Sequence, residues 1–445
     1  MKIALILIAG LPLFTQAATV TFNHDIAPII YKNCSECHHP GEAAPFPLLS
    51  YADTVKKAKT IAKATHARLM PPWKAEPASY PYRDERRLSV FQINLIQEWV
   101  KAGMPEGTGP APEPPKFASG WRLGEPDLVV EMPAAYHVPA DGPDIYRNIA
   151  VPLGLTEDKW ITAIDMRPSA RSVVHHVLYF ADGKGMAHER HEGKEPGFSG
   201  MRAGGAKFPL GGWALGGQPH FYPEGLALSC PKGSDLVVQY HFHPTGKAEA
   251  EKSLIGIYFA KKEPARKLTR IQMPPHYSLF SGLDIAPGQK DFIIRDSYTL
   301  PVAIEGVGVS AHAHYIGKQL KMTATLPGGD VKTLLLINDW DFSWQDRYFF
   351  KDFVKLPKGT RLDTEIHWDN SADNPRNPSS PPIRVTWGEE SKDEMGSVSL
   401  MAVAQKESEV RILRQDVDQR QREMAREKMA TDPVLARKVM KLLAE

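Results

Sequence analysis

The chain has 445 residues, of which 42% are hydrophobic and 24% charged, and its formal net charge at pH 7 is +2. A globular chain of this length is expected to fold as about three units, since domains contain roughly 150 residues each. The small net charge provides no basic surface that would attract DNA or RNA, which excludes nucleic-acid binding as a function class.

The first residues have the pattern of a secretory signal peptide. Lys2 is followed by an apolar run over residues 3–14 and by small residues at Ala17 and Ala18. We therefore expect residues 1–17 to be a signal peptide, cleaved after Ala17 or Ala18. The run is too short to span a bilayer, and no later segment approaches the ~20 apolar residues that spanning requires. A periplasmic or secreted protein without stable membrane insertion is expected, with an uncleaved membrane anchor as the alternative.

The pentapeptide Cys34-Ser35-Glu36-Cys37-His38 is a specific motif that follows shortly afterwards. Its two thiols can form thioethers with a haem while the His38 imidazole binds the iron, so it predicts one covalently bound haem c. A zinc site or a redox dithiol is the alternative. With Cys34 and Cys37 attached to haem, the third cysteine has no partner, and no disulfide within the chain is expected.

Residues 18–108 have the organisation of a small all-α cytochrome c domain, with helices expected over 25–32, 52–68 and 85–102. In the last helix, apolar residues recur at near-helical spacing at Leu88, Phe91, Leu95 and Trp99.

The second axial ligand of the haem iron is predicted to be Met70, in a loop stiffened by two prolines. A thioether at this position favours the reduced iron and raises the potential. Met104, His66 or the absence of any protein ligand are the alternatives.

The amino-acid composition changes several times along the rest of the chain. Residues 109–122 are rich in proline and are predicted to be a semi-extended linker. Short β-branched and aromatic runs separated by turn residues follow, which predicts two antiparallel, jelly-roll-like β-sandwiches over 123–265 and 266–405. Residues 406–445 return to a charged, helix-forming sequence, which either docks on the body or forms a solvated tail.

Histidines gather at three places in the β-rich part. Residues two apart in a strand share a face, so His312 and His314, or His241 and His243, can present two imidazoles to one metal ion. The neighbours His175 and His176 would normally point to opposite faces and need a bulge or a strand end to serve one ion. Imidazoles suit copper, zinc, iron or nickel, and an added thioether favours copper, especially Cu(I).

In this order the motifs resemble those of the copper type II, ascorbate-dependent monooxygenases, the family of peptidylglycine α-hydroxylating monooxygenase and dopamine β-monooxygenase. The resemblance spans roughly residues 125–405 and implies two copper domains. The copper ligands it implies are His175, His176 and His241 for one ion, and His312, His314 and Met395 for the other. Gln239 matches the Gln-x-His setting of the first site.

Further segments refine the resemblance. Asp341-Phe342-Ser343-Trp344-Gln345 and Trp368-Asp369-Asn370-Ser371 are similar to segments common in bacterial members fused to a cytochrome. Where the peptide-hydroxylating enzyme has a substrate-binding arginine, asparagine and tyrosine, this chain has three serines, Ser310, Ser397 and Ser399. A C-terminal glycine peptide is therefore not the expected substrate.

The resemblance implies a reaction in which one oxygen atom of O2 enters a C–H bond of a small organic substrate. The residues that it implies as catalytic are His312, His314, Met395 and Gln239. The haem would pass on electrons from an external donor, such as a redox protein, a quinol-linked donor or an ascorbate-like reductant. The alternatives are a non-catalytic periplasmic electron-transfer or copper-binding protein, and a haem and copper oxidase or reductase of a small inorganic substrate. His243 could also replace His241 as the copper ligand.

Overall fold

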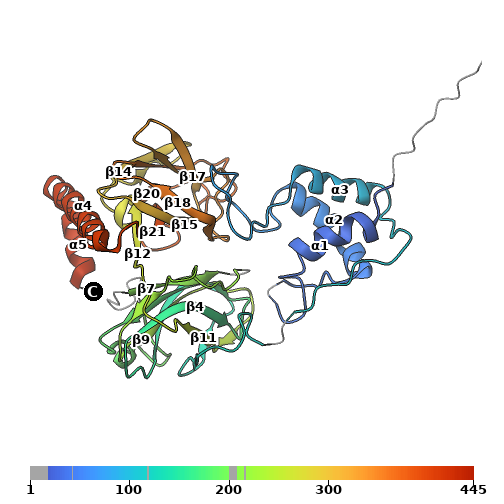
Figure 1. Cartoon of the computed structure of the whole chain (residues 1–445), viewed down its shortest axis with the longest axis horizontal. Coiled ribbons are helices and arrows are strands. Elements are labelled where there is room, and N and C mark those ends of the chain that lie inside the picture. Colours follow the sequence, from blue (N-terminus) through green and yellow to red (C-terminus); the bar gives the residue numbers. More distant parts are fainter. Residues whose placement is uncertain (1–18, 43, 118–119, 200–207, 215–216, 445) are drawn as a thin grey trace, which may run out of the picture. The chain divides into compact units, whose positions relative to one another are not determined.

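The computed structural model describes residues 19–42, 44–117, 120–199, 208–214 and 217–444 (Figure 1). The chain divides into two compact units, of which the first contains residues up to Pro71 together with Arg86–Phe117, and the second contains Pro72–Glu85 and the chain from Ala118 onward. The predicted signal peptide lies outside the described residues. Within the described part, no helix combines the length and apolar character needed to cross a membrane.

The first unit is small and helical. Its elements are a π-helical turn η1 (Phe22–Ile26), α1 (Ala27–Asn33), α2 (Tyr51–His66) and α3 (Val90–Lys101). Helix α2 matches the predicted helix closely and is capped by Ser50, whose hydroxyl accepts from the amide of Asp53. The core of the unit consists of residues from all of these elements, among them Phe22, Ile26, Ile30, Ile61, Ile96 and Trp99.

Helix α3 begins later than the sequence pattern predicts. Ser89 and Gln92 form a capping box, in which each side chain accepts from the other residue's amide, and this fixes the first turn. The buried face is formed by Ile93, Ile96 and Trp99, whereas Phe91 is 70% exposed. Of the apolar residues at near-helical spacing in the sequence, Phe91 thus lies on the exposed side of the helix.

The segment Pro72–Glu85 departs from the predicted continuous 18–108 domain, because it packs with the second unit. We call it the strap. Tyr82 of the strap forms a bridge with Phe350, and its hydroxyl donates to the carbonyl of Leu334 at 2.6 Å. Because Ala75 and Tyr82 are buried in the core of the second unit, the strap is an integral part of that unit.

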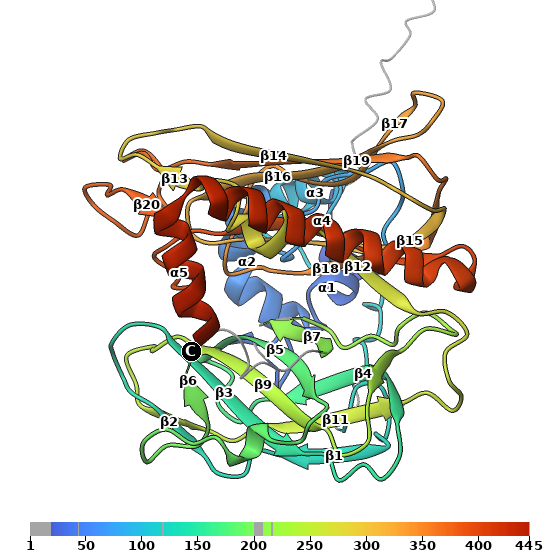
Figure 2. The ribbon, with the colours of Figure 1, turned by 90° about the vertical axis from the view of Figure 1, so that its left-hand side faces the viewer.

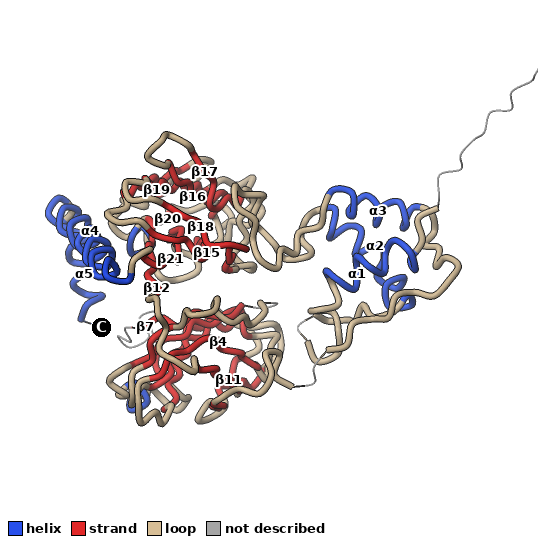
Figure 3. The backbone as a smooth tube through the Cα atoms, viewed as in Figure 1, coloured by secondary structure: helices blue, strands red, loops and turns tan. Residues whose placement is uncertain are grey.

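The second unit begins with a sandwich-like pair of sheets, and strands carry most of the regular structure from here to Ala404 (Figure 3). The five-stranded antiparallel sheet has the order β6 (Phe198–Ser199), β3 (Ile145–Pro152), β9 (Asp235–Phe242), β5 (Val174–Asp182) and β7 (Phe208–Ala214). The sheet opposite it has the order β1 (Leu128–Glu131), β11 (Leu254–Phe259), β4 (Lys159–Arg167) and β8 (Leu228–Cys230). Alternate residues of both sheets, such as Val238 and Ile257, share one apolar core, as expected for packed sheets.

Among the described residues, this part also contains a two-stranded ribbon and a short helix. They are β2 (Tyr136–Val138) paired with β10 (Glu249–Glu251), and the 3-10 turn η2 (Ala187–Glu189). Cys230 at the end of β8 is fully buried, as expected for a small apolar side chain, and no disulfide joins the three cysteines of the described residues.

After β11 the chain enters a second sandwich-like pair of sheets. One sheet has the order β12 (Leu268–Met273), β21 (Gly396–Ala404), β15 (Ile304–Ala313) and β18 (Arg347–Leu356). The other has the order β14 (Phe292–Thr299), β19 (Arg361–Trp368), β16 (Gly317–Thr325) and β17 (Val331–Ile337). The short elements are β13 (Asp284–Ile285) paired with β20 (Val385–Thr386), and the 3-10 turn η4 (Pro275–Ser278). The large core between the sheets includes Leu400, Met322 and Trp368.

The C-terminal segment forms helices that dock on the second sandwich. After the turn η5 (Glu407–Glu409) come α4 (Val410–Thr431) and α5 (Pro433–Ala444), and α4 runs along the sandwich (Figure 2). Leu413 is fully buried in the core of that sandwich, and Arg414 donates to the carbonyl of Leu268. Of the two alternatives for this segment, docking is the one observed.

Candidate metal centres

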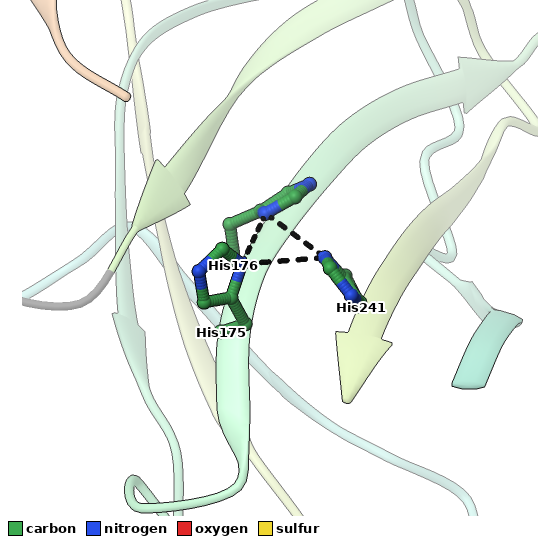
Figure 4. A group of neighbouring side chains, drawn as sticks. All are labelled: His175, His176 and His241. Atoms are coloured by element: carbon green, nitrogen blue, oxygen red, sulfur yellow. Dashed lines mark hydrogen bonds between the residues drawn. The ribbon is translucent and has the colours of Figure 1, made fainter. Parts of the chain in front are cut away.

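Three histidines converge at one end of the five-stranded sheet. The pairing of β5 with β9 shifts its register between Val174 and His176, so that a bulge interrupts the normal alternation of side chains. His176 then pairs with His241 of β9, and the His175 imidazole turns toward the same point. The three Nδ1 atoms lie 3.0 Å (His175 to His176), 3.2 Å (His175 to His241) and 3.3 Å (His241 to His176) apart (Figure 4). The bulge that the adjacent histidines required is therefore present.

This spacing fits three ligands of one metal ion. Imidazole nitrogens bind a metal at about 2.0–2.1 Å, so ligands that share an ion lie roughly 3 Å or more from one another. Burial lowers the pKa of His175 to about 3 and that of His176 well below its ordinary value, with a further contribution from His241. The two rings are consequently neutral at physiological pH and have a free lone pair. His175, His176 and His241 thus form a group that could hold a copper ion.

Asp144 accepts a hydrogen bond from the ring nitrogen of His241 that faces away from the other two histidines. The Nε2 atom of His241 donates to one carboxylate oxygen of Asp144 at 2.8 Å, and the Nδ1 atom of His243 lies 2.8 Å from the other. Although burial opposes ionisation of Asp144, hydrogen bonds from His241, His243 and Ser391 hold the pKa of its carboxyl well below the usual value. Such a carboxylate fixes the ring orientation of a ligating histidine. His243, whose side chain is 56% exposed, contacts Asp144 and lies outside the triad.

A second pair of imidazoles lies on the second sandwich. His312 and His314 project from the end of β15, with ring centroids 5.3 Å apart. The Nδ1 atom of His312 lies 2.6 Å from Oε1 of Gln345, and that of His314 lies 3.1 Å from the carbonyl oxygen of Asp393. Both Nδ1 atoms are thus engaged as donors, which leaves the Nε2 atoms as the available lone pairs. Burial holds the pKa values of these histidines near 4 (His312) and 3 (His314).

Met395 lies beside His314. Ala313 pairs with Gly396 in the ladder between β15 and β21, so His314 and Met395 are the next residues of the two antiparallel chains. Met395 is buried, with only 4% of its surface exposed. The register therefore brings two imidazoles and one thioether to the same corner of the sheet.

The buried carboxyl of Glu394 organises this corner. It accepts from the amides of His314 (2.9 Å) and Ile316 (2.8 Å) and from the indole of Trp368 (2.9 Å). Burial raises the pKa of Glu394 to about 8, against the lowering effect of these hydrogen bonds. Trp368 belongs to one of the two segments noted in the sequence, and its contact explains what that segment does for the site.

The other noted segment places Phe342 between the two groups of histidines. Its ring centroid lies 5.3 Å from that of His175 and 5.4 Å from that of His314, and the ring is buried. The ring centroids of His175 and His314 are therefore no farther apart than the sum of these two distances. Phe342 belongs to the loop over residues 338–346, which also supplies Gln345 to His312.

The two sandwiches are also linked by hydrogen bonds beside the first group. The hydroxyl of Ser391, four residues before Met395, donates to Asp144 at 2.8 Å and lies 2.7 Å from the hydroxyl of Tyr146. Tyr146 in turn stacks on His241, with ring centroids 4.5 Å apart. Sequence reasoning missed Asp144, Ser391 and Tyr146, since each acts through contacts with residues far along the chain.

Gln239 lies on β9 two residues before His241. It is buried, and its Nε2 atom donates to Oδ1 of Asn148 on the neighbouring strand β3 at 3.1 Å. It therefore shares a face of the sheet with His241. Its catalytic role stays a prediction.

In the helical unit, the structure places the residues of the haem motif directly after α1. No disulfide joins Cys34 and Cys37, and the Nδ1 atom of His38 lies 3.0 Å from the carbonyl oxygen of Phe46. A proximal histidine needs its Nε2 atom free and its Nδ1 atom engaged in this way, so the local geometry fits the predicted ligand. Met70 follows α2, its amide donating to the carbonyl of Ala64 at 3.3 Å. Its role as axial ligand stays a prediction.

No family model matches the chain. Curated relatives are DBH-like monooxygenase protein 1 of Gallus gallus, 25% identical over 192 residues, and of Homo sapiens, 26% identical over 192 residues. The match covers 40% of this chain and 30% of each relative, so the chain spans less than a third of their length. A solved structure, the major capsid protein P2 from Bacteriophage PM2, aligns with a TM-score of 0.24 and 10% identity over 62% of this chain and 97% of that one, too low to carry an argument. The chain is thus a distant homologue of DBH-like monooxygenase proteins.

Proposed function

We propose that the protein is an exported copper-dependent monooxygenase that hydroxylates a C–H bond of an organic substrate with O2. The observation that carries the proposal is the pairing of two histidine groups, one on each sandwich, against the single ring of Phe342. The distant homology to DBH-like monooxygenase proteins supports the same conclusion.

His175, His176 and His241 would hold one copper ion through their Nδ1 atoms. Three imidazoles held by a bulge and by Asp144 form a rigid set, which suits a centre that gains and loses an electron with little movement. We assign electron storage and relay to this group.

His312, His314 and Met395 would hold the second copper ion. A thioether is a soft ligand that favours Cu(I), the state that reacts with O2, and a copper ion here would supply the one-electron chemistry of oxygen activation. Gln345 and the Asp393 carbonyl keep the two imidazoles turned toward the site, while the buried ring of Phe342 lies between the groups. A ring in this position reduces the room for water, and removing water strengthens electrostatic interactions and suppresses side reactions.

Each turnover requires two electrons in addition to those of the substrate C–H bond, because the second oxygen atom leaves as water. We assign their delivery to a haem c attached to Cys34 and Cys37 with His38 as a ligand of its iron. The engaged Nδ1 atom of His38 supports this assignment. The signal-peptide pattern favours the periplasm or the exterior, where an external redox protein, quinol-linked donor or ascorbate-like reductant would reduce the haem.

The test of the proposed activity is incubation of the copper-loaded, full-length protein with a reductant, a metabolite mixture and isotopically labelled O2. We expect a product that gains one labelled oxygen atom, and its loss in His312→Ala. Oxygen consumption without labelled organic product would instead point to an oxidase, and an absence of oxygen consumption to a non-catalytic copper or electron carrier.

The haem is tested separately. Purified protein should retain a covalently bound haem after denaturation, and Cys34→Ala combined with Cys37→Ala should abolish it. Cys230→Ala is the matched control, because this third cysteine is buried in the first sandwich and should leave haem attachment unchanged. Haem that dissociates from the denatured wild-type protein would refute the assignment.

A further inference from the structure

One arginine near the His312 and His314 pair has no acidic partner. Arg270 lies on β12, and its side chain is exposed. Its Nε atom donates to the hydroxyl of Ser399 at 3.0 Å and its Nη2 atom to the hydroxyl of Tyr277 at 3.2 Å. Among the described residues, no carboxylate forms an ion pair with it. A guanidinium has five N–H donors, so several of them remain available to a ligand.

The register of the sheet puts Arg270 on the same face as the candidate ligands. Gln272 pairs with Ser399 between β12 and β21, and His312 pairs with Ser397 between β15 and β21. Residues that are paired, or two apart in a strand, project from the same face. The Arg270 side chain therefore lies on the face that carries His312, and the Arg270 charge contributes to the lowered pKa of that histidine.

Tyr277 connects the arginine to His312. Its ring lies edge-on to His312, with centroids 5.3 Å apart, while its hydroxyl accepts from Arg270. The positive charge of Arg270 lowers the pKa of Tyr277. A line of contacts thus runs from the guanidinium through the phenol to the imidazole.

The backbone around Tyr277 is held in an unfavourable conformation. His276, Tyr277 and Ser278 have φ angles of 49°, 53° and 69°, the left-handed region that residues other than glycine seldom occupy. Such a conformation persists only where the surroundings impose it. Here the Ser278 hydroxyl donates to the Gly396 carbonyl at 2.7 Å and the Trp387 indole to the Tyr277 carbonyl at 3.0 Å. These two hydrogen bonds hold the turn that places Tyr277 between Arg270 and His312.

We propose that Arg270, positioned by Ser399 and Tyr277, binds a carboxylate of the substrate and thereby orients the substrate at the His312, His314 and Met395 group. The proposal rests on the proposed function and names its substrate class, a carboxylic acid with an apolar portion that carries the C–H bond. A single guanidinium flanked by neutral hydroxyls matches the single charge of a carboxylate, which it can bind with two parallel hydrogen bonds. The position equivalent to the family's substrate-binding arginine is a serine, Ser310, so the cation comes from a different strand.

The test measures binding and needs no turnover. Calorimetric titration of the copper-loaded, full-length protein would compare matched acids and amides: benzoate with benzamide, phenylacetate with phenylacetamide, and hippurate with its amide. We expect at least one acid to bind about tenfold or more tightly than its amide, as charge-assisted hydrogen bonds imply. In Arg270→Gln the preference should disappear, with the affinity for the amide unchanged, and in Arg270→Lys it should be restored in part.

Arg295→Gln is the control. Arg295 is an exposed arginine of β14 that pairs with Glu365, and both residues belong to the sheet that does not contain Arg270. This variant should keep the preference of the wild-type protein. A wild-type protein without preference for any of these acids would overturn the proposal, as would a preference that survives in Arg270→Gln, which would indicate that the carboxylate binds elsewhere. Because the readout is affinity, a protein that binds acids through Arg270 but forms no product would refute only the proposed activity.

Discussion

The side chains that orient the histidines are as informative as the histidines themselves. Each of the five imidazoles has one nitrogen bonded to an oxygen acceptor or directed to the point that the first three share. The acceptors come from distant parts of the chain: Asp144 for His241, Gln345 for His312 and a backbone carbonyl for His314. Buried imidazoles without such partners would rotate or reorganise the core. Removing an orienting group should therefore weaken metal binding without changing the ligand set.

Asp144→Asn tests this for the first group. The amide cannot accept from His241 and His243 as the carboxylate does, so copper affinity at one of the two sites should fall about 10- to 100-fold, as observed for other outer-shell partners. Competition titration with a Cu(I) chelator measures the change. Asp291→Asn, which alters an exposed carboxylate bound to His367, is the control and should have no effect. Equal weakening of both sites would contradict the assignment of Asp144 to the His241 group.

Gln345→Leu tests whether removing an orienting group weakens metal binding at the His312 and His314 group. Loss of the acceptor at Nδ1 of His312 should lower copper affinity at the other site by about 10- to 100-fold. Gln345→Glu keeps an acceptor oxygen and should restore most of the affinity. Gln319→Leu is the matched control, because Gln319 bonds Asn338 near the surface and not a histidine. Unaltered copper binding in Gln345→Leu would show that His312 needs no such support.

At the scale of elements, the loop over residues 338–346 connects the two sandwiches and the strap. Asp339 and Asp341 of this loop lie 3.3 Å and 3.5 Å from the ammonium group of Lys74, whose side chain is only 5% exposed. Phe342 and Gln345 follow directly and contact the histidines. The strap that begins two residues after Met70 is thus attached to the loop that orders the candidate copper sites.

Helix α4 contributes to stability through a single buried face. Leu413→Ala should destabilise the second unit by about 2–5 kcal/mol, because it removes a fully buried side chain and leaves a cavity. Urea unfolding followed by tryptophan fluorescence measures the loss as a lowered midpoint. The neighbouring Ile412 is 49% exposed, so Ile412→Ala should change the midpoint little. Equal effects of the two substitutions would mean that α4 does not pack as described.

The sequence predicted those elements whose pattern is local. Helix α2 (Tyr51–His66) lies within two residues of the predicted bounds 52–68, and the need for a bulge or a strand end at His175 and His176 followed from side-chain alternation alone. The start of α3 at Val90 depends on a capping box, which the spacing of apolar residues alone did not locate. The strap could not be predicted, because Tyr82 pairs with Phe350, and nothing in the local sequence of 72–85 specifies that contact.

The candidate site divides in the same way. The candidate ligands could be predicted from sequence motifs. The roles of Asp144, Phe342 and Arg270 could not, because they depend on contacts between strands and loops that are far apart in the sequence. Jelly-roll connectivity, the haem ligands and the catalytic role of Gln239 stay predictions.

At the scale of the whole molecule, the account requires electrons to pass from the haem motif to the copper groups within one chain. In this experiment the haem of the Cu(II)-loaded protein is reduced rapidly in the absence of oxygen, and its reoxidation is followed by absorbance. The rate constant of haem reoxidation should be independent of protein concentration. The copper-free protein should keep its haem reduced, and His175→Ala should slow the reaction because it disrupts the relay group. A rate that rises in proportion to protein concentration would mean that transfer occurs between molecules.

The central claim is that the chain holds two copper ions with different ligand sets. X-ray absorption of the Cu(I)-loaded protein, combined with metal analysis, tests it most directly. The account predicts two copper ions per chain and a sulfur ligand that is lost in Met395→Ile, with the nitrogen ligands retained. A single copper ion per chain, or a spectrum without sulfur that Met395→Ile leaves unchanged, would contradict it.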